Sequence, residues 1–379
     1  MRRIWFLLII VLFSCQSNPE KPGPTTLDQL HSRIDEVFDT NLRKDEPGAA
    51  LLIAYDGKML MGKGYGLRDL ESKTPITSST NMRMASVSKQ FTALTILSLI
   101  DKGKLSLKDS VTSIYPYEIF EGVTIEQLIN HTSGIADAEE AFFAIWDSTK
   151  IAENKDLVDW YAANPVSPAK PGGKYRYNNG AYELLAAIAE ESSGMGFAQF
   201  AKEHVFQRAG MKETNFFNLA HPIDIKERAY CYQKDSVGNW NKVDGHFLNG
   251  LLGAGGVYTN INDYFRYDQA LRKRTILSDS LHDRIFSHSS MALPTSDYRN
   301  FVFVHDDPIY YAMGWNICRD IAFHGGGWFG TSTFVIRELD RPLTIAIFTN
   351  SELLFESDLT NEVYEIVDDY VKNQETIDH

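Results

Sequence analysis

Ser86 and Lys89 form the sequence pattern with the clearest chemical use. In Ser86-Val87-Ser88-Lys89 they stand at the start of a segment with helical spacing of apolar residues, so the hydroxyl and the amine share one helix face. A serine becomes a good nucleophile when a base takes its proton, and burial in a cleft can lower the pKa of a lysine enough for that task. The pattern alone is weak, because Ser167-Pro168-Ala169-Lys170 repeats it in a Pro-rich loop.

A second pattern, Tyr177-Asn178-Asn179, lies in a predicted turn that opens a helix. A phenol at this point can relay protons between Ser86 and a leaving group, while the Asn179 amide can hydrogen-bond a substrate carbonyl or Lys89. Tyr-x-Asn also occurs at 258–260 and at 298–300, so a turn with a packed tyrosine is the alternative interpretation.

The third pattern is His324-Gly325-Gly326-Gly327, which follows a predicted short strand. Glycines let a substrate lie along a strand edge and pair with its backbone. His324 can donate to a substrate carboxylate or carbonyl, and it is expected to change charge near neutral pH. A core histidine at a glycine-rich bend is the alternative.

In type and order, these patterns resemble the three boxes of the serine β-lactamase and penicillin-binding-protein superfamily, specifically its class C β-lactamase-like and D-alanyl-D-alanine carboxypeptidase branch. In that family the boxes are Ser-x-x-Lys, Tyr-x-Asn, and Lys-Thr-Gly or His-x-Gly. The segments 128–135 and 253–263 also look familial, and the resemblance covers the chain from about residue 27.

The resemblance implies roles for individual residues. Ser86 would be acylated, and Lys89 and Tyr177 would share the general-base and general-acid work. Asn179, His324 and Gly326 would bind substrate, and the N–H groups of Ser86 and Gly327 would form the oxyanion hole. No cofactor or metal is implied, and the carboxylates at Asp137, Glu139 and Glu140 are interpreted as a solvated loop.

The elements that must position these residues are strands near both ends of the chain, with helices between them. An amphipathic helix is predicted from Leu27 to about Leu42, with Thr26 and Gln29 as a capping box. Two apolar runs joined at Asp56-Gly57 predict a hairpin. After a helical middle, strands return at 310–317, 321–324, 332–337 and 343–348, and a helix over 359–371 closes the chain.

This order predicts an α+β fold, in which one mainly antiparallel sheet is assembled from both ends of the chain. The family resemblance implies a five-stranded antiparallel sheet flanked by N- and C-terminal helices, with an inserted, mainly helical lobe. We assign 27–80 and 305–379 to the sheet lobe and 81–304 to the helical lobe, and we expect the site between them.

The first residues predict export. Arg2 and Arg3 precede an apolar run too short to span a bilayer, so residues 1–14 are interpreted as a signal peptide. Leu12-Phe13-Ser14-Cys15 resembles a bacterial lipoprotein box, which implies lipidation of Cys15, with 15–26 as lipidated cysteine and tether. The expected location is the periplasm or cell surface, with a lipid anchor as the only membrane contact. Plain secretion is the alternative.

Composition narrows the class of partner. A formal net charge of −13 disfavours nucleic-acid binding, and a small-molecule or peptide substrate is expected. Cys231 and Cys318 lack any Cys-x-x-Cys or Cys/His grouping, so they either pair after export or remain buried thiols.

The predicted function is a serine hydrolase acting on a peptide, amide or ester, of the D-alanyl peptidase, amidase or esterase type. Efficient β-lactamase activity is less expected, because His324 stands where class C β-lactamases carry a lysine, whose permanent charge holds the antibiotic's carboxylate. The alternatives are a sensor of penicillin or cell-wall fragments that acylates without efficient turnover, and an interaction protein that uses aromatic residues of the helical lobe.

Overall fold

The computed structural model describes residues 25–288, 291–294, 298–304 and 307–377. The predicted signal peptide and Cys15 lie outside these residues. None of the helices in the described ranges is long and apolar enough to cross a membrane.

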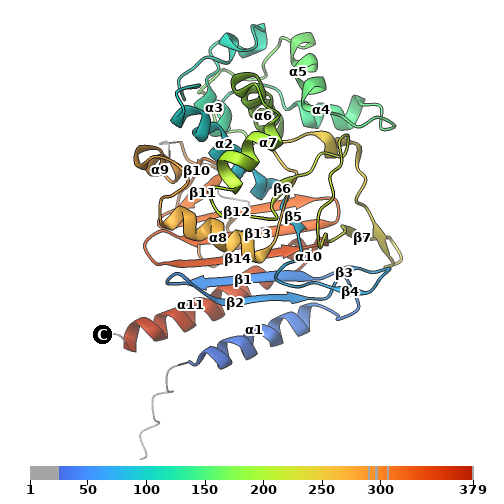
Figure 1. Cartoon of the computed structure of the whole chain (residues 1–379), viewed down its shortest axis with the longest axis vertical. Coiled ribbons are helices and arrows are strands. Elements are labelled where there is room, and N and C mark those ends of the chain that lie inside the picture. Colours follow the sequence, from blue (N-terminus) through green and yellow to red (C-terminus); the bar gives the residue numbers. More distant parts are fainter. Residues whose placement is uncertain (1–24, 289–290, 295–297, 305–306, 378–379) are drawn as a thin grey trace, which may run out of the picture.

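A large antiparallel sheet lies at the centre of the fold and confirms the α+β class (Figure 1). Its strand order is β10-β11-β12-β13-β14-β1-β2. The strands are β1 (Ala49–Tyr55), β2 (Lys58–Tyr65), β10 (Ile309–Ala312), β11 (Trp315–Cys318), β12 (Ile321–Trp328), β13 (Thr331–Glu338) and β14 (Leu343–Thr349).

The two ends of the chain meet inside this sheet. Strand β1 pairs with β14 from Ala49↔Thr349 to Tyr55↔Leu343, and both strands are almost wholly buried. The predicted β1–β2 hairpin is present, with Asp56 (φ 47°) and Gly57 (φ 72°) in the left-handed region that tight hairpin turns require.

The sheet has seven strands where the family resemblance implied five. The predicted strand 310–317 is two four-residue strands, because Met313 (φ 47°) and Gly314 (φ 86°) fold it into the β10–β11 hairpin. The turn also explains the glycine: a Cβ on Gly314 would lie 2.6 Å from the backbone nitrogen of Gln90, at the start of a core helix. This hairpin therefore braces the helix that follows Ser86.

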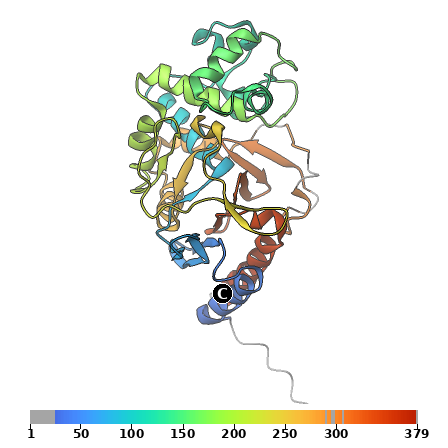
Figure 2. The same ribbon diagram turned by 90° about the vertical axis from the view of Figure 1, so that its right-hand side faces the viewer.

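Helices at both ends of the chain lie beside one another against one face of the sheet, at the bottom of Figures 1 and 2. They are α1 (Leu27–Asn41) and α11 (Leu359–Ile377). The capping box predicted for α1 is confirmed: Thr26 Oγ1 accepts from the Gln29 N–H, and Gln29 Oε1 accepts from the Thr26 N–H.

Apart from α10, the other helices lie between β2 and β10 in sequence. Helices α3 to α6 gather at the end of the molecule far from α1 and α11 (Figure 2). They are α2 (Lys89–Asp101), α3 (Ile125–Ile129), α4 (Ala138–Ile145), α5 (Asn154–Ala163), α6 (Asn179–Ser193), α7 (Phe197–Ala201), α8 (Ile261–Arg272), α9 (Asp279–Ile285) and α10 (Leu353–Glu356). Almost every residue of α2 is buried, which makes it the central helix of the fold.

The expectation that strands return only near the C-terminus was wrong. Short strands pair within the middle of the chain, where runs of two or three residues leave no alternating pattern to detect. They are β5 (Met82–Arg83), β6 (Asn215–Phe216), β7 (Tyr232–Lys234), β8 (Trp240–Lys242) and β9 (Val257–Thr259); the remaining strands, β3 (Leu67–Asp69) and β4 (Thr74–Pro75), pair with one another. Cys231 and Cys318 are buried free thiols and do not form a disulfide.

Candidate active site

Ser86 lies in a short 3₁₀ turn, η1 (Ala85–Ser88), directly before α2. The residue before it, Ala85, has φ 44°, a left-handed conformation that is costly for a residue with a Cβ. The turn is fixed from behind, because Ser88 Oγ accepts a hydrogen bond of 3.1 Å from the Val257 N–H. Ser88 is fully buried, whereas Ser86 is partly exposed, so Ser86 is the hydroxyl a substrate can reach.

Strands β12 and β13 hold this turn from the other side. Thr333 on β13 donates to the carbonyl of Met84 at 2.9 Å. On β12, a Cβ at Gly326 would lie 2.6 Å from the Met84 oxygen and 3.0 Å from the Ser86 nitrogen, so only glycine fits there. The glycine-rich segment was predicted to follow a strand, but it lies within β12. Because its glycines have no side chains, the strand backbone can lie directly against the nucleophile turn.

Lys89 is completely buried one turn after Ser86. Its Nζ lies 3.3 Å from Ser86 Oγ, and it donates to Asn179 Oδ1 at 2.7 Å and to the Ala254 carbonyl at 3.0 Å. Burial lowers the pKa of Lys89 to about 8, although the charges of Glu139, Glu183 and Asp137 act in the opposite direction. A substantial share of Lys89 is therefore neutral in mildly alkaline solution and can accept the proton of Ser86.

Tyr177 lies beside both Lys89 and Ser86. Its ring centroid is 4.7 Å from Lys89 Nζ, and its hydroxyl shares a hydrogen bond with Ser86. Burial raises the pKa of Tyr177, and the Ser86 hydrogen bond only partly offsets this. Tyr177 is therefore a neutral phenol near neutral pH, suited to donating or relaying a proton.

Asn179 connects Lys89 to a carboxylate that the sequence interpretation missed. The Asn179 Oδ1 faces Lys89, and its Nδ2 donates to Glu139 Oε1 at 2.8 Å. Glu139 is only 7% exposed, so its assignment to a solvated loop was wrong. Glu139 is buried because of Asp137. This residue caps α4 and accepts hydrogen bonds from the Asn179 and Gly180 N–H groups, which holds the start of α4 against the start of α6.

A second carboxyl group, Glu183, lies behind Glu139 and is 1% exposed. Burial raises the pKa of both groups, that of Glu183 to well above its usual value. The two groups interact with one another, and burial together with the neighbouring negative charges favours keeping a proton on this carboxyl pair. Asn179 and Glu183 are four residues apart on α6 and so share a helix face.

His324 differs from expectation. It is 4% exposed, and burial, aided by the charge of Lys89, lowers its pKa to about 3. Its Nδ1 lies 2.5 Å from the Gly325 oxygen and its Nε2 3.2 Å from the Tyr311 hydroxyl. The prediction that His324 changes charge near neutral pH was therefore wrong, because burial beside a lysine arises from tertiary contacts that no local pattern indicates.

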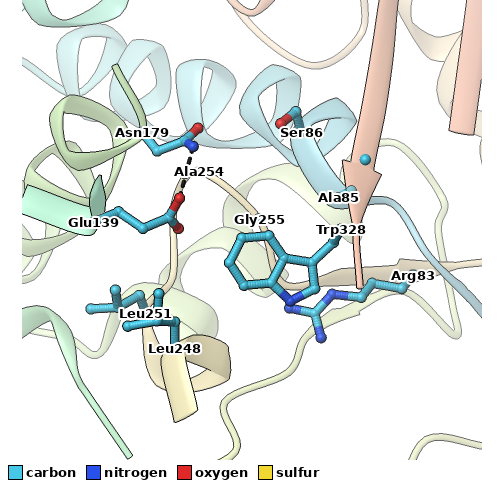
Figure 3. Close-up of a pocket in the computed structure, with 11 residues that line it drawn as sticks. Arg83, Ala85, Ser86, Glu139, Asn179, Leu248, Leu251, Ala254, Gly255 and Trp328 are labelled. Carbon is cyan, nitrogen blue, oxygen red and sulfur yellow. Dashed lines mark hydrogen bonds between the residues drawn. The ribbon is translucent and has the colours of Figure 1, made fainter. Parts of the chain in front are cut away.

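Two cavities lie beside the nucleophile turn and share Gly327, and Ser86 lines the smaller one. The smaller, of ≈ 40 Å³, is lined by Ser86, Glu139, Asn179, Gly327 and Trp328, among others. Figure 3 shows Asn179 and Glu139 joined by a hydrogen bond on one side of this space and Trp328 with Arg83 on the other. The larger, of ≈ 600 Å³, is mostly apolar and is lined by Tyr177, His324, Gly326, Gly327, Phe334 and Phe355, among others.

The structure thus brings together all the residues expected in the site. The placement of Ser86 and Gly327 on the wall of the small cavity is compatible with an oxyanion hole formed by their N–H groups. Within the described ranges, no group of three or more His, Cys, Asp or Glu side chains is arranged to hold a metal ion.

Comparisons with known proteins agree with this arrangement. Residues 33–366 match the model of the Beta-lactamase family. The chain is 34% identical over 336 residues to penicillin-binding protein 4* of Bacillus subtilis (strain 168), covering 84% of this chain and 71% of that protein. It is 28% identical over 373 residues to esterase EstB of Burkholderia gladioli, covering 87% and 93%. The solved structure of D-amino acid amidase from Ochrobactrum anthropi SV3 superposes with a TM-score of 0.74 at 22% identity, covering 92% and 99%.

Proposed function

The chain belongs to the β-lactamase family of serine hydrolases, and on this premise we propose that it hydrolyses an amide, peptide or ester through an acyl-enzyme on Ser86. The observation that carries the proposal is the buried Lys89, whose Nζ lies 3.3 Å from Ser86 Oγ and whose pKa is lowered to about 8. A nucleophile and a base in hydrogen-bonding reach are what covalent catalysis needs.

In the proposed acylation, neutral Lys89 takes the proton of Ser86 as the oxygen attacks the substrate carbonyl. The negative charge on the carbonyl oxygen would be held by the N–H groups of Ser86 and Gly327. Tyr177, a neutral phenol in contact with Ser86, would then give its proton to the leaving group as the carbonyl re-forms and take a proton back from Lys89, so that the proton of Ser86 ends on the leaving group. Deacylation would use the same groups in reverse, with water in place of the leaving group.

The state of His324 supports amides and esters over β-lactams. A β-lactam antibiotic carries a carboxylate, and a permanent cation is the usual partner for such a group. His324 is buried and neutral, and both of its ring nitrogens already have partners within the protein. The apolar cavity beside Tyr177 instead suits an uncharged leaving group.

The test is labelling with a fluorophosphonate probe and with a fluorescent penicillin. We expect the fluorophosphonate to label the wild type and Ser167→Ala, and to leave Ser86→Ala unlabelled. Ser167→Ala is the matched control, since Ser167 begins the other Ser-x-x-Lys pattern but hydrogen-bonds the Ile119 carbonyl, away from the site. Equal labelling of Ser86→Ala would remove Ser86 as the nucleophile.

Turnover separates an enzyme from a sensor. Neutral short-chain thioesters and esters should be hydrolysed repeatedly by the wild type, and intact mass spectrometry should show no adduct that persists once substrate is consumed. A stable acyl adduct that survives for hours would contradict hydrolysis and favour the sensor alternative.

We also propose that the protein is exported and anchored through Cys15. The support is the sequence alone: the apolar run and Leu12-Phe13-Ser14-Cys15. Expression in a bacterium, followed by detergent phase partitioning, should place the wild type in the detergent phase and Cys15→Ser in the aqueous phase. Aqueous partitioning of both would indicate plain secretion.

A further inference from the structure

Helix α3 ends on a histidine at a position where helices commonly end on a glycine. His131 follows the last helical residues with φ 56°, in the left-handed region. Its N–H donates to the Leu128 carbonyl, and the Thr132 N–H donates to the Gln127 carbonyl, which is the hydrogen-bond pattern of a Schellman motif. A glycine would meet every backbone requirement of this motif, so the choice of histidine points to its side chain.

The imidazole of His131 is buried and carries a polar group without a partner. Its Nδ1 accepts a hydrogen bond of 3.1 Å from the Asn178 N–H, so the proton of the neutral ring lies on Nε2. Burial, followed by the charges of Lys89 and His324, holds the pKa of His131 well below its usual value, so the ring is neutral. Within the described part of the chain, Nε2 has no hydrogen-bond partner. An unpaired buried donor and a left-handed backbone both lower stability, and such costs persist mainly at functional sites.

His131 holds the backbone on both sides of Tyr177. The His131 carbonyl accepts from the Arg176 N–H at 2.8 Å, and its Nδ1 accepts from the Asn178 N–H. Tyr177, the residue between them, packs its ring against the imidazole, with 4.4 Å between the ring centroids. One residue therefore makes three contacts that fix the tyrosine, one on each neighbour in the chain and one on the ring itself.

The histidine lies outside the path of the proton. Its Nδ1 is occupied by a backbone N–H, and among the described residues neither ring nitrogen hydrogen-bonds Ser86, Lys89 or Tyr177. Tyr177 reaches the reaction centre itself, because its hydroxyl hydrogen-bonds Ser86 and its ring centroid is 4.7 Å from Lys89 Nζ. His131 is therefore placed to orient Tyr177 and not to move a proton.

The rest of the site is held by other contacts. Asn179 donates through its N–H to Asp137 and through its Nδ2 to Glu139, both at 2.8 Å. Lys89 and Ser86 lie at the start of α2, in another segment of the chain, and contact one another directly. Loss of the His131 side chain should therefore displace the Tyr177 phenol while the contact between Lys89 and Ser86 remains.

We propose that His131 is a positioning residue for the reaction: it holds the Tyr177 phenol where this group can protonate the leaving group, by binding the backbone on both sides of the tyrosine and packing against its ring. The inference rests on the proposed function, in which Tyr177 is the general acid. A proton donor fixed in place acts far better than one that is free to move. A displaced phenol should slow only those substrates whose leaving group needs a proton.

The test compares two esters with one acyl group and different leaving groups. Near neutral pH, p-nitrophenyl butyrate releases a phenolate that needs no proton, whereas ethyl butyrate releases an alkoxide that does. In Tyr177→Phe, kcat/KM should fall about 100-fold more for the ethyl ester than for the nitrophenyl ester, the size of one general-acid contribution. His131→Gly should show the same asymmetry by at least about tenfold, since glycine keeps the helix end and removes the ring.

Three further variants separate positioning from stability. His131→Asn keeps an acceptor near the place of Nδ1 and tolerates a left-handed backbone, so it should restore most of the wild-type ratio of the two esters. Lys73→Gly is the matched control, because it puts a glycine at another left-handed position, φ 53°, in the exposed turn between β3 and β4; its ratio should stay within about twofold of wild type. In His131→Gly/Tyr177→Phe, kcat/KM for the ethyl ester should be no lower than in Tyr177→Phe alone, since both changes remove one function.

Circular dichroism and Tm confirm the fold of each variant. An equal loss for both esters in His131→Gly would make the residue structural only and overturn the inference. A His131→Asn ratio no better than that of His131→Gly, or an additional loss in the double variant, would also overturn it. If Tyr177→Phe changes the ratio of the two esters and His131→Gly does not, the inference fails while the proposed function stands. If Ser86→Ala still hydrolyses both esters, the proposed function fails and the inference fails with it.

Discussion

The pH dependence of Ser86 reactivity is the sharpest prediction of the structure. If neutral Lys89 is the base, the rate of Ser86 modification follows the neutral fraction of a group whose pKa is lowered to about 8 by burial. That fraction is about one tenth at pH 7, one half at pH 8 and nine tenths at pH 9. The rate should therefore rise about fivefold from pH 7 to 8 and about twofold from pH 8 to 9.

The assay is the second-order rate of labelling by the fluorophosphonate between pH 6 and 9.5. This probe reports on nucleophilic attack alone and contains no leaving group that titrates in this range. The rate of spontaneous probe hydrolysis is measured in parallel, and circular dichroism confirms that the fold is unchanged across the range. Full-chain protein is used throughout.

A variant that lowers the pKa of Lys89 further tests the same reasoning. Among the charges that raise the pKa of Lys89, Glu139 contributes most. Glu139→Gln removes it, so the ammonium form of Lys89 loses stabilisation and the acid limb should move about one pH unit lower. Glu140→Gln should leave the limb near pH 8, because this side chain is exposed. The prediction is refuted by a rate that is flat between pH 6 and 9, or by a limb that moves upward in Glu139→Gln.

Three further predictions concern the strand, the buried acid and the histidine. Gly326→Ala puts a Cβ 2.6 Å and 3.0 Å from backbone atoms of the nucleophile turn, so fluorophosphonate labelling should slow by about 100-fold. Gly325→Ala is the matched control and should stay active, because its Cβ would be 3.3 Å from the Phe334 ring. Glu183→Gln should raise Tm at pH 7 and flatten its decline above pH 5. The folded-state pKa of Glu183 is raised, so the wild type loses stability as pH rises above about 4.5, whereas a glutamine does not ionise. Because His324 is neutral, nitrocefin kcat/KM should be at least about tenfold below that of the best thioester, and similar values would contradict this.

The catalytic boxes could be predicted because each is encoded by a short stretch of sequence. Ser86 and Lys89 are one helical turn apart, and a glycine such as Gly326 is needed where a strand backbone approaches another segment closely. The α1 capping box and the Asp56-Gly57 hairpin are local in the same sense, and both are confirmed. The sheet could be placed in outline, but its β10–β11 turn could not, because Met313 is not a typical residue for a left-handed conformation.

The carboxyl pair could not be predicted in the same way, because its members meet through tertiary structure. Glu139 follows Asp137 in a sequence that reads as an exposed helix start, and only the contact between α4 and α6 buries it. One signal was present: Glu183 lies among Tyr182, Leu184 and other apolar residues of α6, one turn after Asn179 and on its face. A glutamate on the buried face of an apolar helix needs a partner, and the only motif residue on that face was Asn179.

The charges around Lys89 follow from the same consideration, and they set the reactivity of this base. Burial alone would favour the neutral lysine, and the charges of Glu139, Glu183 and Asp137 oppose it, which together set the pKa at about 8. Each activation of Ser86 discharges Lys89 and leaves the Glu139 carboxylate without a cation. Removing Glu139 should therefore speed attack on neutral substrates near pH 7, whereas a purely structural role for this residue would only slow it.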